Sequence, residues 1–89
     1  MLDNRTKSLI RGLVYPIQFD GNPIDGVDRV LTQVVDRKAL GATPGEFLAS
    51  VRAALESSEP LADLIPQHHP EPVIRAYLAE IQKRLEKPA

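Results

Sequence analysis

Residues 43–57, TPGEFLASVRAALES, carry the clearest helix signal in this chain. Thr43 and Glu46 have the spacing of a capping box, in which each side chain satisfies a free backbone N–H of the first turn. Pro44 is suited to the first helical position, because its missing N–H needs no partner there. We therefore predict a helix over residues 43–57 whose apolar residues face a core: Phe47, Leu48, Val51, Ala54 and Leu55.

The segment before this helix has the same helical period. We expect a helix from about Gly26 to Leu40, with Asp25 as its N-cap and Gly41 directly after its end. Its apolar stripe consists of Val27, Val30, Leu31, Val34 and Val35. The stretch 20–26 that precedes it is rich in Asp, Asn, Gly and Pro, which is typical of a loop.

The N-terminal residues 3–14 form another candidate helix, with an apolar face made of Leu9, Ile10, Leu13 and Val14. Residues 13–19, LVYPIQF, are rich in β-prone side chains. The sequence leaves open whether residues 13–19 continue the helix or become extended.

The C-terminal part predicts a short helix from about Pro60, which Pro66 ends, and a long one over residues 70–86. The long helix has Pro70 at its first position and His69 as its N-cap. Its buried stripe is Ile74, Tyr77, Leu78, Ile81 and Leu85. Together, these segments predict an all-α fold, a single domain over residues 1–89 built as a small bundle of four to five helices.

Composition narrows the class of protein. The chain has no cysteine, which excludes disulfides and Cys-ligated zinc, and this fits a cytoplasmic protein. No apolar run approaches the roughly 20 residues that span a membrane. A net charge of −1 makes a general nucleic-acid binder unlikely, because such proteins are usually basic.

Acidic residues are concentrated in the second half of the chain. Residues 46–71 hold five acids against one base, Arg52. The acids are Glu46, Glu56, Glu59, Asp63 and Glu71. Such a band is either an ordinary solvated face or a docking surface that steers a basic partner. Glu46, Glu59 and Glu71 also suit helix N-termini, which leaves both interpretations open.

The pair His68-His69 suggests a metal at first sight, but metal-binding helices favour i, i+4 spacing. We interpret the pair mainly as a polar connector between prolines and, if functional, as a contact for a partner. The loop from Asp20 does not match a calcium-binding EF-hand, since its fifth position is Ile24 and its twelfth is Leu31.

Motifs for catalysis are missing from the sequence. No serine or threonine lies in a recognisable nucleophile motif, and no glycine-rich phosphate loop is present. A bundle of this size is also expected to lack a pocket of about 300 Å³ or more. We therefore expect a protein that is not an enzyme and that needs no cofactor and no metal.

A small, cysteine-free helical protein with these five acids and the segment 61–69 resembles the immunity proteins of bacterial contact-dependent growth inhibition and related polymorphic toxin systems. The resemblance implies a partner that is a basic, often nuclease-type, toxin domain, which the immunity protein neutralises by occlusion. The residues that we expect to contact this partner are Glu56, Glu59, Asp63, His68, His69 and Glu71.

Two other functions stay open. Basic residues near both ends, including Arg5 and Lys83, would suit a small DNA-binding or transcription-accessory protein. In that case the helix over 43–57 would present Glu46 and Glu56 to the phosphates, which disfavours this alternative. The third alternative is an oligomer-forming helical structural module, for which a homo-oligomer is expected.

Overall fold

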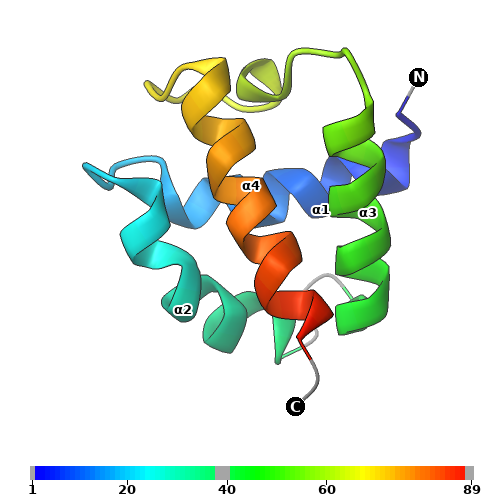
Figure 1. The fold of residues 1–89 in the computed structure, drawn as a ribbon. Coiled ribbons are helices and arrows are strands. Elements are labelled where there is room, and N and C mark those ends of the chain that lie inside the picture. Colours follow the sequence, from blue (N-terminus) through cyan, green and yellow to red (C-terminus); the bar gives the residue numbers. More distant parts are fainter. Residues whose placement is uncertain (1, 38–40, 88–89) are drawn as a thin grey trace.

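The computed structural model describes residues 2–37 and 41–87, which fold as an all-α bundle (Figure 1). Three α-helices form its frame: α1 (Asn4–Val14), α3 (Pro44–Glu56) and α4 (Glu71–Glu86). Shorter helical pieces connect them: η1 (Tyr15–Ile17), η2 (Pro23–Gly26), α2 (Val27–Val30), η3 (Leu31–Val35) and η5 (Leu61–Asp63). The predicted fold class is confirmed.

Helix α4 runs down the middle of the bundle, with α2 on one side, α3 on the other and α1 crossing behind it (Figure 1). The most extensive packing joins α3 to α4 and α1 to α3. The core is aliphatic around two rings, Phe47 and Tyr77, which are both fully buried. The Tyr77 hydroxyl donates to the carbonyl oxygen of Leu13 at 2.5 Å, so this polar group is satisfied inside the core. Burial raises the pKa of the Tyr77 hydroxyl.

The capping box that the sequence predicts at α3 is confirmed. The Thr43 hydroxyl accepts from the Glu46 N–H at 3.2 Å, and the Glu46 carboxylate accepts from the Thr43 N–H at 3.3 Å. Phe47, Val51 and Ala54 are buried, as their spacing predicts, whereas Leu48 and Leu55 are only partly buried. The local sequence therefore determines both the start and the buried face of this helix.

Residues 13–19 are helical or turned, so the extended alternative is wrong. Helix α1 passes directly into the 3-10 turn η1, and the N–H of Gln18 donates to the carbonyl oxygen of Tyr15 at 3.3 Å. The N–H of Asp20 then donates to the carbonyl oxygen of Ile17 at 3.1 Å. Burial of Val14 and Ile17 against the core outweighs the β propensity of this stretch.

The segment after the loop differs from the single helix that we predicted. It consists of the 3-10 turn η2, one turn of α-helix in α2 and the π-helix η3, in which the N–H of Asp36 reaches the carbonyl oxygen of Leu31 at 2.8 Å. Asp25 is not the N-cap, because Asn22 takes that role for η2 by accepting from the Ile24 N–H at 3.2 Å. The predicted end at Leu40 lies outside the described residues.

The structure explains why glycine stands at two positions of this region. Gly41 has a φ of 69°, the left-handed conformation that was expected of the glycine at this position. Gly26 packs so closely that a Cβ atom would lie 2.8 Å from Oδ2 of Asp20 and 2.9 Å from Cγ2 of Ile17. A larger residue at this position would therefore force the side chains of Asp20 and Ile17 to move.

The C-terminal helix follows the prediction with one correction. Its stripe is buried at Ile74, Tyr77, Leu78 and Ile81. The helix starts at Glu71 and has Pro70 as its N-cap, so His69 does not cap it. In the described part of the chain, none of the helices combines the length and apolar character that crossing a bilayer requires.

Candidate functional site

The acidic band of the sequence divides into two groups in the structure. Glu71 belongs to the group that holds the fold together. Its carboxylate accepts from the N–H groups of Leu61 and Ala62 at 2.9 and 2.7 Å, and from Nε of Arg75 at 2.8 Å. It thereby caps the first turn of η5 from ten residues away, which leaves few lone pairs for a partner.

The electrostatics of Glu71 agree with this structural role. Partial burial raises the pKa of its carboxyl, but the two backbone N–H groups and the Arg75 guanidinium together outweigh burial and hold the pKa below its usual range. Arg75 extends the network by donating to the carbonyl oxygens of Ser57 and Glu59, both at 2.9 Å. The loop between α3 and η5 is therefore fastened to the first turns of α4.

Glu46 also belongs to the group that holds the fold together. It completes the capping box of α3 and pairs with Arg5 at 3.4 Å. The base of the band, Arg52, pairs with Glu86 at 2.6 Å, which bridges α3 and the end of α4. Charged side chains from elsewhere in the chain therefore partly neutralise the charge that the sequence assigns to the band.

The second group of acids lies where α3 ends and η5 begins. Glu56 and Asp63 are exposed, and their carboxylates form no hydrogen bond or ion pair with the described residues. Glu59 lies between them, half-buried, and its Oε2 accepts from the N–H of Leu2 at 2.8 Å. We call Glu56, Glu59 and Asp63 the acidic corner.

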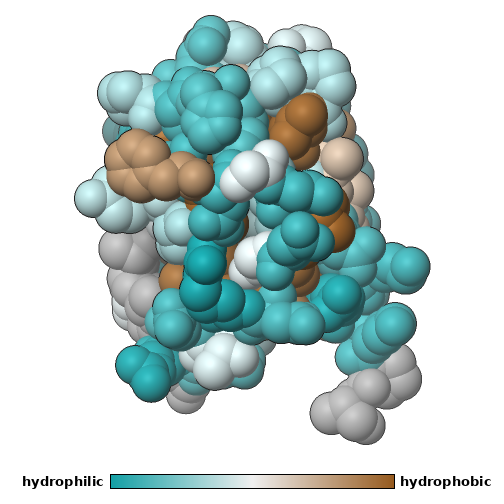
Figure 2. Space-filling view, turned by 90° about the vertical axis from the view of Figure 1, so that its left-hand side faces the viewer, coloured by the Kyte–Doolittle hydropathy of each residue, from teal (hydrophilic) through white to brown (hydrophobic). Residues whose placement is uncertain are grey.

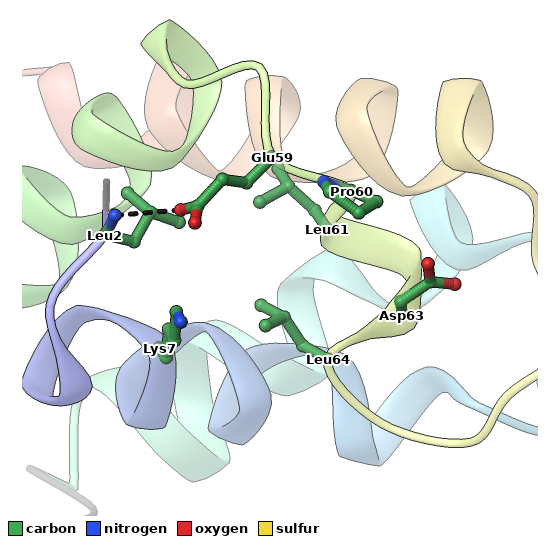
Figure 3. A pocket seen from close by; sticks show the side chains of 7 residues that line it. All are labelled: Leu2, Lys7, Glu59, Pro60, Leu61, Asp63 and Leu64. Atoms are coloured by element: carbon green, nitrogen blue, oxygen red, sulfur yellow. Dashed lines mark hydrogen bonds between the residues drawn. The ribbon is translucent and has the colours of Figure 1, made fainter.

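A pocket of about 250 Å³ opens beside the acidic corner, between α1 and η5 (Figure 3). Apolar side chains form most of its wall: Leu2, Pro60, Leu61 and Leu64. Glu59 and Asp63 stand on its η5 side, and Lys7 stands on its α1 side. The pocket therefore combines an apolar interior with charges of opposite sign on its two edges.

A second, more polar hollow adjoins this pocket and shares Leu2 and Glu59 with it. It measures about 450 Å³ and includes Glu56 and the serines that follow α3. The prediction that so small a bundle lacks a pocket above 300 Å³ is therefore wrong. The hollow lies where the chain leaves α3, between Ser57, Ser58 and the N-terminal Leu2.

The two histidines have different surroundings. His69 is only 5% exposed, and its Nε2 lies 3.1 Å from the carbonyl oxygen of Ile17, so it joins the connector before α4 to the end of η1. His68 is exposed, with its ring centroid 4.0 Å from that of His69. Within residues 2–37 and 41–87, no group of His, Asp and Glu side chains is arranged to hold a metal ion.

Sequence reasoning missed Gln67, which shapes the connector between η5 and α4. Its Nε2 donates to the carbonyl oxygens of Ala62 and His69 at 3.0 and 2.8 Å, and its Oε1 accepts from the His69 N–H at 2.7 Å. Nothing in the local sequence signals this role, because a glutamine between prolines and histidines is ordinary loop composition.

Sequence reasoning also missed an exposed apolar group in the stretch from η1 to η2. Phe19 is 89% exposed, Tyr15 is 66% exposed and Ile24 is 37% exposed. Figure 2 shows one side of the molecule, which is mostly polar, with brown apolar side chains among teal ones. An aromatic residue beside the loop sequence Asp20-Gly21-Asn22 was the available signal for this exposure.

Most of the arginines that would serve a nucleic-acid surface are engaged within the chain. Arg29 pairs with Asp20 at 2.7 Å, and Arg84 pairs with Glu80 at 2.8 Å and also with Asp28. Arg75 is committed to Glu71. These pairs lower the positive potential that binding to phosphates needs.

Comparison with known proteins found no matching family model, no curated relative and no similar solved structure.

Proposed function

We propose that this chain is a non-enzymatic binding protein that docks a basic protein partner on the acidic corner. The observation that carries the proposal is that Glu56 and Asp63 are exposed and unpaired within the described residues, directly beside an apolar pocket. Exposed carboxylates accelerate the encounter with a basic surface, and an adjoining apolar pocket holds the complex after the encounter.

The partner class that we propose is a toxin domain, as the resemblance to immunity proteins implies. Such a protein acts by covering the active surface of its toxin, for which it needs a rigid docking face and no catalytic group of its own. The network of Glu71 and Arg75 supports rigidity, since it fastens the corner loop to α4. We expect the protein to act in the cytoplasm, which the absence of cysteine favours.

The docking set is smaller than the one that the sequence suggested. We leave out Glu71 and His69, because their side chains bond within the chain. His68 remains at the edge of the set, since it is exposed on the connector that follows η5. The core of the proposed surface is therefore Glu56 and Asp63, with Glu59, whose Oε2 already accepts from the N–H of Leu2, between them.

Affinity capture from the native host tests the proposal. The bait is the full chain, compared with the double variant Glu56→Lys/Asp63→Lys and with a control, Asp25→Lys/Asp36→Lys. Both variants change the net charge equally, but Asp25 and Asp36 are exposed acids in η2 and directly after η3, the segments that flank α2. We expect one basic protein that the wild type and the control retain and that the corner variant loses.

The captured protein is then produced in a bacterial host with and without this chain. If the partner is a toxin domain, it stops growth alone, and co-expression of this chain restores growth. Equal capture by the corner variant and the wild type would contradict the docking surface. A partner that is harmless to the host would contradict the toxin-inhibitor function while leaving the surface intact.

A further inference from the structure

Leu2 is buried beside the acidic corner, although it lies outside every helix of the described chain. Its side chain is only 8% exposed, and its N–H donates to Oε2 of Glu59 at 2.8 Å, across 57 positions of sequence. Figure 3 shows this bond at one edge of the pocket between α1 and η5. A backbone hydrogen bond together with a buried side chain is also how proteins commonly bind an extended peptide segment.

Leu2 and Glu59 lie where the two hollows of this region meet. The apolar pocket of about 250 Å³ and the polar hollow of about 450 Å³ share these two residues and no other described residue. If Leu2 leaves, the two hollows become one groove, and Oε2 of Glu59 loses its N–H donor. The groove then offers an apolar wall and a hydrogen-bond acceptor to another occupant.

Release of Leu2 leaves the adjoining helix intact. Asp3 caps α1, and its carboxylate accepts from the N–H of Thr6 at 2.7 Å. Its carbonyl oxygen accepts from the N–H of Lys7 at 3.0 Å. Rotation about the N–Cα bond of Asp3 moves Leu2 without breaking either bond. Such local opening of a short segment requires less free energy than global unfolding.

The charges around the groove indicate a basic occupant. Among the described residues that line the two hollows, three are acids and one, Lys7, is a base. Glu56 lines the polar hollow and Asp63 lines the apolar pocket, so each hollow has a carboxylate without a partner in the described chain. A segment with an apolar residue between two bases complements this arrangement.

We propose that Leu2 occupies the place of a partner residue, and that the partner displaces Leu2 with an apolar residue of an extended, basic segment. The apolar side chain of the partner replaces that of Leu2, and its backbone N–H donates to Glu59. The flanking bases of the segment pair with Glu56 and Asp63. This inference rests on the proposed function, to which it adds the kind of segment that is recognised and the internal contact that competes with it.

An NMR titration of the full chain with the acetylated and amidated peptide Lys-Leu-Lys tests the displacement. The wild type binds the peptide only while Leu2 is released, so its apparent affinity is reduced by the released fraction. The shorter side chain of Leu2→Ala competes less, and this variant should bind the peptide at least about tenfold more tightly than the wild type. Leu85→Ala is the matched control, because Leu85 is a half-buried leucine in the last turn of α4 that lines neither hollow.

The direction of the change in affinity distinguishes displacement from a purely structural role. If Leu2 only forms a wall of the peptide site, Leu2→Ala removes a contact with the peptide and weakens its binding. An affinity of Leu2→Ala that is unchanged or weaker would therefore overturn the proposal. So would a gain of affinity in Leu85→Ala as large as that in Leu2→Ala, because it would follow from destabilisation alone.

Two altered peptides test the individual contacts with the Leu2→Ala variant. N-methylation of the peptide's leucine keeps its side chain but removes the N–H that would donate to Glu59, which should weaken binding at least about fivefold. The peptide Glu-Leu-Glu, which reverses both flanking charges, should not bind measurably at low salt. Equal binding of either altered peptide and Lys-Leu-Lys would contradict the recognition that we propose.

A measurement on the unmodified chain covers the case in which Leu2→Ala does not fold. With ¹³C-labelled leucine methyl groups, saturation with Lys-Leu-Lys should move the methyl signals of Leu2 toward those of an unstructured leucine. The methyl signals of Leu64, which lines the pocket, should shift and remain distinct from those of an unstructured leucine. Unchanged Leu2 signals, or no shift of any signal up to about 10 mM peptide, would overturn the proposal.

The peptide and the captured partner separate this inference from the proposed function. If a basic protein is captured through the acidic corner while Lys-Leu-Lys does not displace Leu2, the displacement is refuted and the proposed function stands. If the peptide displaces Leu2 while no basic protein is captured, the proposed partner is refuted and the recognition of a basic segment stands.

Discussion

Glu71 and Asp63 are eight residues apart in an acidic band that looks uniform in the sequence, yet they occupy contrasting regions of the molecule. Glu71 is held by two backbone N–H groups and by Arg75. Asp63 is exposed at the edge of a pocket, and its carboxylate has no partner among the described residues. The difference teaches that acids which look alike in the sequence divide into those that stabilise the fold, such as Glu71, and those without a partner among the described residues, such as Asp63.

The largest effect should come from removing the carboxylate of Glu71. Glu71→Ala leaves the N–H groups of Leu61 and Ala62 without their acceptor, so we expect a loss of about 2–3 kcal/mol in the free energy of unfolding. Urea unfolding followed by circular dichroism measures this value. Asp63→Ala, the matched control, should change it by less than about 0.5 kcal/mol. Equal losses of unfolding free energy in the two variants would contradict the difference between Glu71 and Asp63.

A second, smaller effect concerns Arg75. Its guanidinium serves the Glu71 carboxylate and the carbonyl oxygens of Ser57 and Glu59 in one planar arrangement. Arg75→Lys keeps the charge but loses this geometry, which should cost about 1–2 kcal/mol. Arg52→Lys is the control, because Arg52 makes only an exposed pair with Glu86. A larger loss in the control than in Arg75→Lys would show that the corner loop is not fastened by Arg75.

The dependence of stability on pH separates the regions further. Glu71 has a lowered pKa in the folded chain, so its contribution is complete above its ordinary value of 4.5 and is lost as the pH falls through the lowered pKa. The stability difference between the wild type and Glu71→Gln should therefore shrink on acidification below about pH 4.5. Unfolding curves between neutral and acidic pH measure it. A difference that stays constant with pH would contradict a charged Glu71 in the fold.

The smallest effect on stability, and the largest on association, should come from the acidic corner. Glu56→Gln/Asp63→Asn should leave the free energy of unfolding within about 0.5 kcal/mol of the wild type. The same variant should slow association with a basic partner at low salt and lose this difference at high salt. Stopped-flow mixing with the captured partner at two ionic strengths measures both rates. An association rate equal to that of the wild type at low salt would show that the acidic corner is ordinary solvated surface and not a docking site.

The parts of the fold that were predictable depend on neighbours in sequence. The Thr43–Glu46 capping box and the buried stripe of α4 follow from spacings of three and four residues, which helical geometry brings together. The cap at Asn22 and the change from 3-10 to α to π in the second segment were not predictable. This segment packs closely against residues before it, since a Cβ atom on Gly26 would lie 2.8 Å from Oδ2 of Asp20 and 2.9 Å from Cγ2 of Ile17, and the local sequence pattern does not predict such a contact.

The candidate site was predictable only in part. Glu56, Glu59 and Asp63 were chosen from charge alone, and the structure places them around one corner. Leu2 and Lys7 were missed because they join that corner from the other end of the chain. His69 was interpreted as a surface contact, yet it is buried through a bond to Ile17, 52 residues earlier.

The sequence by itself determined that this chain is helical, where α3 starts and which faces of α1, α3 and α4 are buried. These properties depend on backbone hydrogen bonds and apolar spacing within a few residues. Only the tertiary structure decided that Glu46 and Glu71 bond within the fold, whereas Glu56 and Asp63 have no partner among the described residues. A carboxylate such as Glu71 finds its N–H donors through chain packing, and charge counted along a sequence carries no information on that packing.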